Sequence, residues 1–194
     1  MHQLIILLLG VISLSGSIVG TFGTISIRDF ELRGYVDPTQ DSNLPFIMSR
    51  LGVNVQLEQY DSSALHDNLE LIQASNFTWV RQFAYWDAIE PTHGTYDWQT
   101  WDTIIEAIGD YPELELVVVL MNTPSWAREN SDTTQTAPPQ SPESFATFAH
   151  HFAERYGHTI DYYQIWDEPN LDDAWGLLNP RPAEYVALLT EAYQ

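Results

Sequence analysis

The sequence contains no cysteine, so it offers no disulfide, no thiol nucleophile and no thiolate ligand for a metal. Basic residues are also scarce, because 7 Lys plus Arg stand against 27 Asp plus Glu and give a formal net charge of -20. A field of that sign repels the phosphates of nucleic acids and the headgroups of anionic lipids. We therefore expect no nucleic-acid partner, whereas an uncharged ligand such as a sugar is compatible with this charge.

Apolar and aromatic side chains, by contrast, are plentiful. Of the 194 residues, 44% are hydrophobic and 13% are aromatic, which is enough to bury the core of one domain and argues against disorder. No Gly-rich phosphate loop follows the first expected strand, and the adjacent His150 and His151 lack the spacing of metal ligands. We expect neither a nucleotide cofactor nor a metal.

The longest apolar run lies near the N-terminus. Residues 4–20 (LIILLLGVISLSGSIVG) carry no charge and end in small residues, as an export signal does. No Lys or Arg precedes the run, and it is nearly long enough to span a bilayer, so an uncleaved anchor and a buried core segment remain alternatives. We expect residues 1–23 to be a signal peptide or membrane anchor, and the protein to be secreted or extracytoplasmic.

Further along, short apolar runs alternate with stretches of helical spacing. The apolar runs, which predict strands, are residues 52–57, 77–82, 114–121 and 160–166. The helical stretches are residues 64–74, 98–108, 143–156 and 182–192, with expected starts at Asp61, Asp97 and Ser141. This fourfold alternation predicts an α/β fold with a parallel sheet and right-handed crossovers.

A doubly wound sheet and a TIM (β/α)8 barrel both fit this alternation. The missing Gly-rich loop counts against a dinucleotide-binding open sheet. A (β/α)8 barrel takes about 250 residues, so residues 52–194 supply its N-terminal half, about four β/α units. Residues 24–51 are interpreted as a preceding leader or hairpin segment.

Active sites of parallel β/α folds form at the C-terminal ends of the strands. The polar residues expected at those ends are Glu58, Gln59, Arg81, Gln82, Asn122, Asp167 and Glu168, with Trp126 close to Asn122. Aromatic rings beside hydrogen-bonding groups suit a sugar, whose C–H face packs on an apolar plate while its hydroxyls need donors and acceptors. Taken singly, an arginine at a strand end is more often a structural ion pair, and a tryptophan is more often core.

Glu168 is the strongest catalytic candidate. Glycosidic cleavage needs one carboxylic acid that is still protonated and one ionised carboxylate. Glu168 follows an apolar strand and lies beside Asp167 and Trp166, so burial and the neighbouring charge should favour its protonated form. The same acids before Pro169 also suit a helix start without chemistry, and spacing alone leaves both interpretations open.

Two stretches together resemble a known group of enzymes. "IWDEPN" (165–170) is similar to the Trp-Asn-Glu-Pro motif that ends the fourth strand in the clan of retaining (β/α)8 glycoside hydrolases. "FTWVRQ" and "WDAIEPTHGTYDW", both within residues 77–98, are similar to the second strand and its loop. The resemblance covers residues 50–194 and is strongest to the β-xylosidase and α-L-iduronidase family, glycoside hydrolase family 39.

This resemblance implies roles for individual residues. Glu168 would be the general acid/base, Arg81 would lie near the nucleophile, and Asn122 and Trp126 would face the sugar subsite. Asp167 replaces the family's asparagine, and an ionised carboxylate only accepts hydrogen bonds, whereas an amide also donates them. Its contact with the sugar 2-hydroxyl is therefore expected to change. The implied substrate is an oligo- or polysaccharide.

The family's nucleophile is a glutamate at the end of strand seven, beyond the four expected units. Retaining hydrolysis needs the two carboxyl groups about 5 to 5.5 Å apart, so we expect this polypeptide alone to be inactive and to be part of a longer enzyme. Two alternatives stay open: a non-catalytic carbohydrate-binding or interaction module with the same cleft, and a membrane-tethered protein that uses the fold as a scaffold.

Overall fold

The computed structural model describes residues 13, 16, 17, 19–21, 23, 24, 51–160 and 162–193. The described residues among 13–24 are helical and belong to a unit separate from residues 48–194. The expected signal or anchor (1–23) and the leader (24–51) therefore lie almost wholly outside the described residues. Within the described part of the chain, no helix combines the length and hydrophobicity that crossing a membrane requires.

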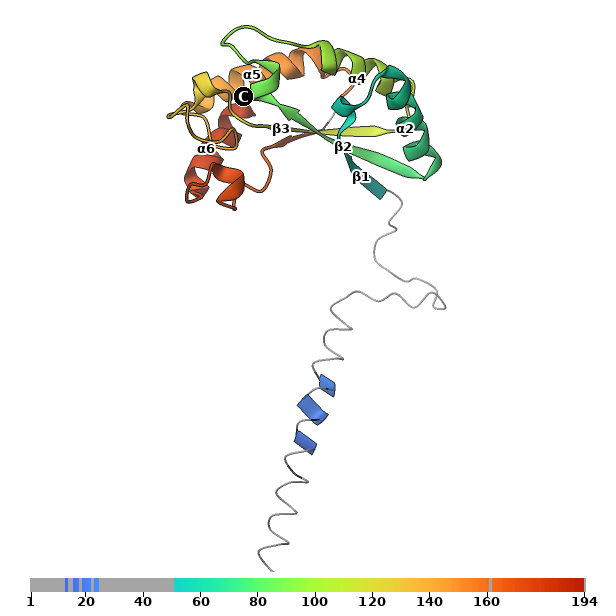
Figure 1. The fold of residues 1–194 in the computed structure, drawn as a ribbon, viewed down its shortest axis with the longest axis vertical. Coiled ribbons are helices and arrows are strands. Elements are labelled where there is room, and N and C mark those ends of the chain that lie inside the picture. Colours follow the sequence, from blue (N-terminus) through green and yellow to red (C-terminus); the bar gives the residue numbers. More distant parts are fainter. Residues whose placement is uncertain are drawn as a thin grey trace, which may run out of the picture. The chain divides into compact units, whose positions relative to one another are not determined.

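A four-stranded parallel sheet forms the centre of the second unit (Figure 1). Its strands are β1 (Leu51–Val55), β2 (Phe77–Tyr85), β3 (Glu115–Met121) and β4 (Tyr162–Ile165). Spatial order follows chain order, and each neighbouring pair is parallel. Helices connect consecutive strands, as right-handed β/α crossovers do. The expected half-barrel of four β/α units is confirmed.

The main helices begin close to where capping residues predict them. They are α2 (Ser62–Ala74), α4 (Gln99–Gly109), α5 (Pro142–Tyr156) and α6 (Pro182–Ala192). Shorter turns are η1 (Leu57–Gln59), α3 (Trp86–Ile89), η2 (Ser125–Ala127) and η3 (Asp173–Trp175). The Asp61 carboxylate accepts a hydrogen bond from the Ala64 amide at 2.9 Å and so caps α2. Pro142 opens α5, where its missing N–H is not needed.

Strand β2 is longer than the sequence predicted, and β1 is shorter. β2 continues past Gln82 to Tyr85 and stays paired with β3 as far as Met121. β1 ends at Val55, because the chain turns into η1 two residues later. The extension of β2 by three residues carries two further side chains, Phe83 and Tyr85, to the C-terminal edge on the same face as Arg81.

Successive residues of β2 alternate between the two faces of the sheet, as strand geometry requires. Figure 1 shows α2, α4 and α5 following one side of the sheet. The side chains buried toward these helices are Val80, Gln82 and Ala84, and the half-buried ones on the opposite face are Trp79, Arg81, Phe83 and Tyr85. The second face is the inner wall of the expected barrel, so it carries the polar and aromatic residues of the mouth.

A chain of packed aromatic rings fills the core beneath the helices. Trp86 stacks on Phe148 with centroids 5.5 Å apart, Phe145 meets Trp166 at 6.0 Å, and Trp166 meets Trp175 at 5.5 Å. All five side chains are fully buried. Burying a large apolar side chain stabilises the fold by about 1.5–3 kcal/mol. Trp86, Trp166 and Trp175 therefore belong to the core and do not form sugar platforms.

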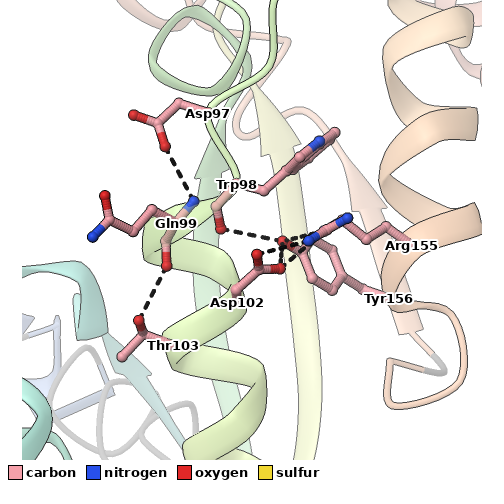
Figure 2. Close-up of polar contacts among 7 residues, drawn as sticks. All are labelled: Asp97, Trp98, Gln99, Asp102, Thr103, Arg155 and Tyr156. Atoms are coloured by element: carbon pink, nitrogen blue, oxygen red, sulfur yellow. Dashed lines mark hydrogen bonds and ion pairs between the residues drawn. The ribbon is translucent and has the colours of Figure 1, made fainter.

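A polar clamp joins α4 to α5 on the outer side of this core (Figure 2). Arg155 donates two hydrogen bonds to Asp102, from Nε at 2.9 Å and from Nη2 at 2.7 Å. The Tyr156 hydroxyl donates to the same carboxylate at 2.8 Å, and the Arg155 guanidinium lies 5.7 Å from the ring centroid of Trp98. The hydrogen bonds from Arg155 lower the pKa of Asp102, and burial raises the pKa of Tyr156.

Candidate active site

A cavity of about 490 Å³ opens where the C-terminal ends of β2, β3 and β4 meet. Its lining residues are Phe83, Tyr85, Asp87, Ala88, Met121, Asn122, Gln135, Thr136 and Asp167. Parallel β/α folds bind their ligands at this end of the sheet. Of the residues that the sequence predicted for the site, the structure brings Asn122 and Asp167 into the cavity wall.

One wall of the cavity is aromatic. Phe83 and Tyr85 lie two residues apart on β2, and their rings are parallel to within 3° with centroids 5.9 Å apart. Both side chains are half-buried, and Met121 of the adjacent strand continues the surface. Parallel rings at a strand end provide a flat apolar face, on which the C–H face of a sugar can pack.

A polar part of the cavity wall is formed by Asp87 in α3 and by Asn122, which directly follows β3. Asn122 is only 6% exposed and has a left-handed backbone, with φ of 67°. Burial raises the pKa of Asp87, while the hydrogen bond of its carboxyl with the Asn122 side chain acts in the opposite direction. The Oδ1 atoms of both residues are buried and have no hydrogen-bond partner among the described residues. This wall therefore holds unused hydrogen-bonding capacity.

Arg81 does not point into free solvent but ties three strands together. Its Nη2 donates to Asp167 Oδ1 at 2.6 Å, its Nε donates to Gln164 Oε1 at 3.1 Å, and its Nη1 donates to Asn54 Oδ1 at 3.3 Å. The guanidinium also lies 4.8 Å from the ring centroid of Phe83. The structural ion pair considered from the sequence is therefore present, and it lies at the cavity. The positive charge of Arg81 offsets the negative charge that Asp167 was expected to place beside Glu168.

Glu168 is exposed, and it is not among the residues that line the cavity. The burial that the sequence predicted for Glu168 is therefore wrong for the described residues. The physical reason is that β4 is an edge strand of the described sheet, so no described strand covers its outer side. Trp166 and Glu168 both have left-handed backbones, with φ of 65° and 46°. Such conformations are uncommon for residues with a side chain and often mark functional turns.

Trp126 lies away from the cavity wall. Its Nε1 donates to the Glu90 carbonyl at 3.0 Å, its ring meets Trp86 edge-on at 5.4 Å, and His93 packs 4.5 Å from it. These contacts hold Trp126 over the segment that follows β2. The structure thus does not bring it together with Asn122 and Asp167 in the cavity lining, because its ring completes the core edge instead.

The connection between β3 and α5 is fixed over the cavity by buried hydrogen bonds. The fully buried Thr123 donates from its amide to the Gln135 carbonyl at 2.7 Å and from Oγ1 to the Ala137 carbonyl at 2.6 Å. Thr136 Oγ1 donates to the Asp173 carbonyl at 3.0 Å, in the connection after β4. These bonds place Gln135 and Thr136 in the cavity wall.

Sequence reasoning missed most of the remaining lining residues. Phe83 and Tyr85 could have been found by continuing the alternation of β2 beyond Gln82, since they share a face with Arg81. Gln135 and Thr136 lie in a Thr/Pro-rich stretch with no motif, so no sequence signal indicates them. Within the described part of the chain, no group of three or more metal-ligating side chains comes together.

The parallel β/α half-barrel carries its aromatic and carboxylate-bearing cavity at the strand ends, where (β/α)8 enzymes have their active sites. The sequence model of glycoside hydrolase family 42, described as beta-galactosidase, matches residues 55–154, which is just over half of the chain. The chain belongs to this glycoside hydrolase family. No curated protein sequence matches it.

Three solved structures share the fold. They are a family 39 glycoside hydrolase from Bacteroides cellulosilyticus (18% identity, TM-score 0.56), an exo-beta-1,4-mannosidase from an Opitutaceae bacterium (17%, 0.58) and a beta-glucosidase from Exiguobacterium marinum (15%, 0.51). The matches cover 73%, 75% and 68% of this chain but only 28%, 29% and 31% of the respective structures. The chain thus spans under a third of their length, and the resemblance to glycoside hydrolases noted from the motifs is confirmed.

Proposed function

We propose that this chain supplies the acid/base half of a retaining glycoside hydrolase, with Glu168 as the general acid/base. The observation that carries the proposal is the placement of Asp167 and Glu168 two and three residues after the end of β4, where Asp167 lines the cavity and is held by Arg81. Membership in a glycoside hydrolase family supports the same reaction class. Glycosidases of this kind need a carboxyl group at that edge of the barrel.

The other predicted residues act on the bound sugar in this proposal. Asn122 and Asp167 contact ring hydroxyls from the cavity wall, and Arg81 holds Asp167 in position. Because Asp167 accepts hydrogen bonds and cannot donate them when ionised, it receives a hydroxyl proton where an asparagine would have both options. Trp126 contributes to the site only indirectly, through its packing against the segment after β2.

In the first step of the reaction, Glu168 donates its proton to the leaving glycosidic oxygen while a second carboxylate attacks the anomeric carbon and the C–O bond breaks. In the second step, Glu168 takes a proton from the water that displaces this carboxylate. The resemblance assigns the second carboxylate to a seventh strand. We therefore propose that the four described β/α units bind sugar but do not complete both steps by themselves.

The family description makes a terminal β-galactoside the first substrate to test. The sequence of residues 4–20 supports an exported enzyme, with a membrane tether as the alternative. Polysaccharide fragments outside the cell are the substrates that such a location would provide.

The decisive experiment compares leaving groups on the product of the complete reading frame. Glu168→Gln should abolish turnover of methyl β-D-galactoside, whose leaving oxygen must be protonated, but should retain much of the first step on the 2,4-dinitrophenyl glycoside, whose leaving group needs no acid. Equal losses on both substrates, or unchanged turnover, would remove Glu168 from this role.

A non-catalytic carbohydrate-binding module is the second candidate. It is favoured by the exposure of Glu168 and by its position outside the cavity lining. A binding module would retain its affinity for galactosides after Glu168→Gln and would show no turnover in the complete product. The leaving-group comparison therefore separates the two functions.

A further inference from the structure

The assigned roles leave one cavity residue unexplained. Asp87 lies in the first turn of α3 and lines the cavity between the aromatic wall of β2 and Asn122. Its Oδ1 is buried without a hydrogen-bond partner among the described residues, and the same is true of the adjacent Asn122 Oδ1. The two unpaired Oδ1 atoms beside a sugar-sized cavity require an explanation, since buried polar groups are normally paired.

A purely structural role accounts for only part of the Asp87 side chain. Its carboxyl interacts with the backbone amides of Asp87 and Ala88, as an acid at the start of a helix does. That interaction does not involve Oδ1, which stays unpaired. Because Asp87 lines the cavity and its carboxyl torsion is broad, a ligand hydroxyl in the cavity can compete for a carboxyl oxygen.

The charges around Asp87 make this wall unfavourable for anions. Burial, and then the negative charges of Glu58, Asp87 and Asp167, raise the pKa of Tyr85. The positive charge of Arg81 is bound to Asp167. Arg128 attracts Asp87 electrostatically, but its guanidinium donates to the Thr133 carbonyl.

We propose that Asp87 is a specificity-determining residue, whose carboxylate accepts hydrogen bonds from the hydroxyls of a sugar packed on Phe83 and Tyr85 and excludes sugars that carry a carboxylate or sulfate. This inference rests on the proposed function and names the class of sugar that the same cavity admits. Hydroxyl groups supply the donors that the Oδ1 atoms of Asp87 and Asn122 lack. A uronic acid would instead place a second negative charge beside Asp87 and Asp167, in a partly buried site where like charges repel strongly.

The test measures binding to the full chain at low ionic strength by isothermal titration calorimetry. Methyl β-D-galactopyranoside is compared with methyl β-D-galactopyranosiduronic acid, which differs in its carboxylate. The wild-type chain should bind the neutral sugar about tenfold or more tightly than the uronide. Asp87→Asn should weaken the binding of the neutral sugar and bring the affinities for the two sugars to within about threefold of each other.

Matched variants separate recognition from stability and from general charge. Asp87→Asn preserves the shape of the side chain and an acceptor for the amides at the start of α3, so its Tm should match that of the wild type, while Asp87→Ala removes both the cavity acceptor and these contacts. Asp67→Asn changes the net charge by the same amount on the exposed face of α2, and it should leave the sugar selectivity unchanged.

Wild-type selectivity in a folded Asp87→Asn variant would overturn the proposal, and so would equal binding of both sugars, or of neither, by the wild-type chain. The outcome is independent of catalysis. Glu168-dependent turnover combined with unchanged Asp87→Asn selectivity contradicts only the role of Asp87. Asp87-dependent selectivity without Glu168-dependent turnover contradicts only the catalytic function proposed above.

Discussion

Arg81 and Asp167 form an ion pair, with Nη2 and Oδ1 2.6 Å apart, that links β2 to the second residue after β4 across the intervening β3. The two side chains are 25% and 30% exposed. The same guanidinium reaches Asn54 on β1 and Gln164 on β4. One side chain on the inner face of the sheet therefore fixes the relative positions of three strand ends at the cavity.

We predict that Arg81→Ala lowers the free energy of unfolding by about 1–3 kcal/mol, because it leaves the Asp167 carboxylate half-buried without its cation. Asp167→Asn should cost less than about 1 kcal/mol, since an amide oxygen still accepts from Arg81. Urea unfolding of both variants and of the double variant measures the coupling between them. Additive effects would show that the ion pair carries no energy of its own.

Gly176 is predicted to be intolerant of any side chain. Its backbone is left-handed, with φ of 74°, and an added Cβ would meet the Ala137 Cα at 2.5 Å. Gly94 is the matched control, because its φ is 76° but a Cβ there meets nothing within 4 Å. Gly94→Ala should cost only the backbone strain, about 1–2 kcal/mol, whereas Gly176→Ala should cost about 1–3 kcal/mol more. Equal losses of stability for the two variants in thermal unfolding would mean that the segments carrying Gly176 and Ala137 can move apart without cost.

The clamp between Asp102 and Arg155 should contribute stability that depends on pH (Figure 2). Because the pKa of Asp102 is lowered from 3.8 in the folded chain, its contribution is fully present above that value and is lost as the pH falls through the lower folded pKa. Asp102→Asn should reduce Tm at pH 7 by about 1–3 °C.

The difference in Tm between wild type and Asp102→Asn should shrink as the pH falls through the folded pKa of Asp102, which lies below 3.8, because the protonated Asp102 is then as uncharged as the amide that replaces it. Asp132→Asn, an exposed loop acid, is the control for the general loss of negative charge. A Tm difference that stays constant down to the lowest pH would show that Arg155 does not stabilise the ionised carboxylate.

The fold was predictable from the sequence because hydrophobic periodicity decides it locally. The short, valine-rich apolar run of β3 indicates a buried strand and the spacing of α4 indicates a helix, and the alternation of such segments leaves few topologies. The cap at Asp61 was predictable for the same reason, since its side chain acts on an amide three residues away.

The site was only partly predictable, because it depends on the directions in which its side chains point. Neighbouring residues in the sequence do not determine these directions. Asp167 and Glu168 are adjacent, yet one lines the cavity and the other is exposed, since the backbone after β4 adopts two left-handed positions. From the sequence, Trp126 could equally have been a platform for a sugar or part of the core. Its hydrogen bond to the Glu90 carbonyl holds it at the edge of the core. Asp87 escaped notice because β2 ends three residues later than its composition indicates.

All four strands of the sheet run in the same direction, so the connections that shape the cavity gather at one pole and the turns that return the chain to the sheet gather at the other. A change in the length or composition of the segment that carries Gln135 and Thr136 would alter which molecules fit, while the opposite pole and the packed helices keep their geometry. The substrate range of such a protein can therefore diverge while its fold is retained.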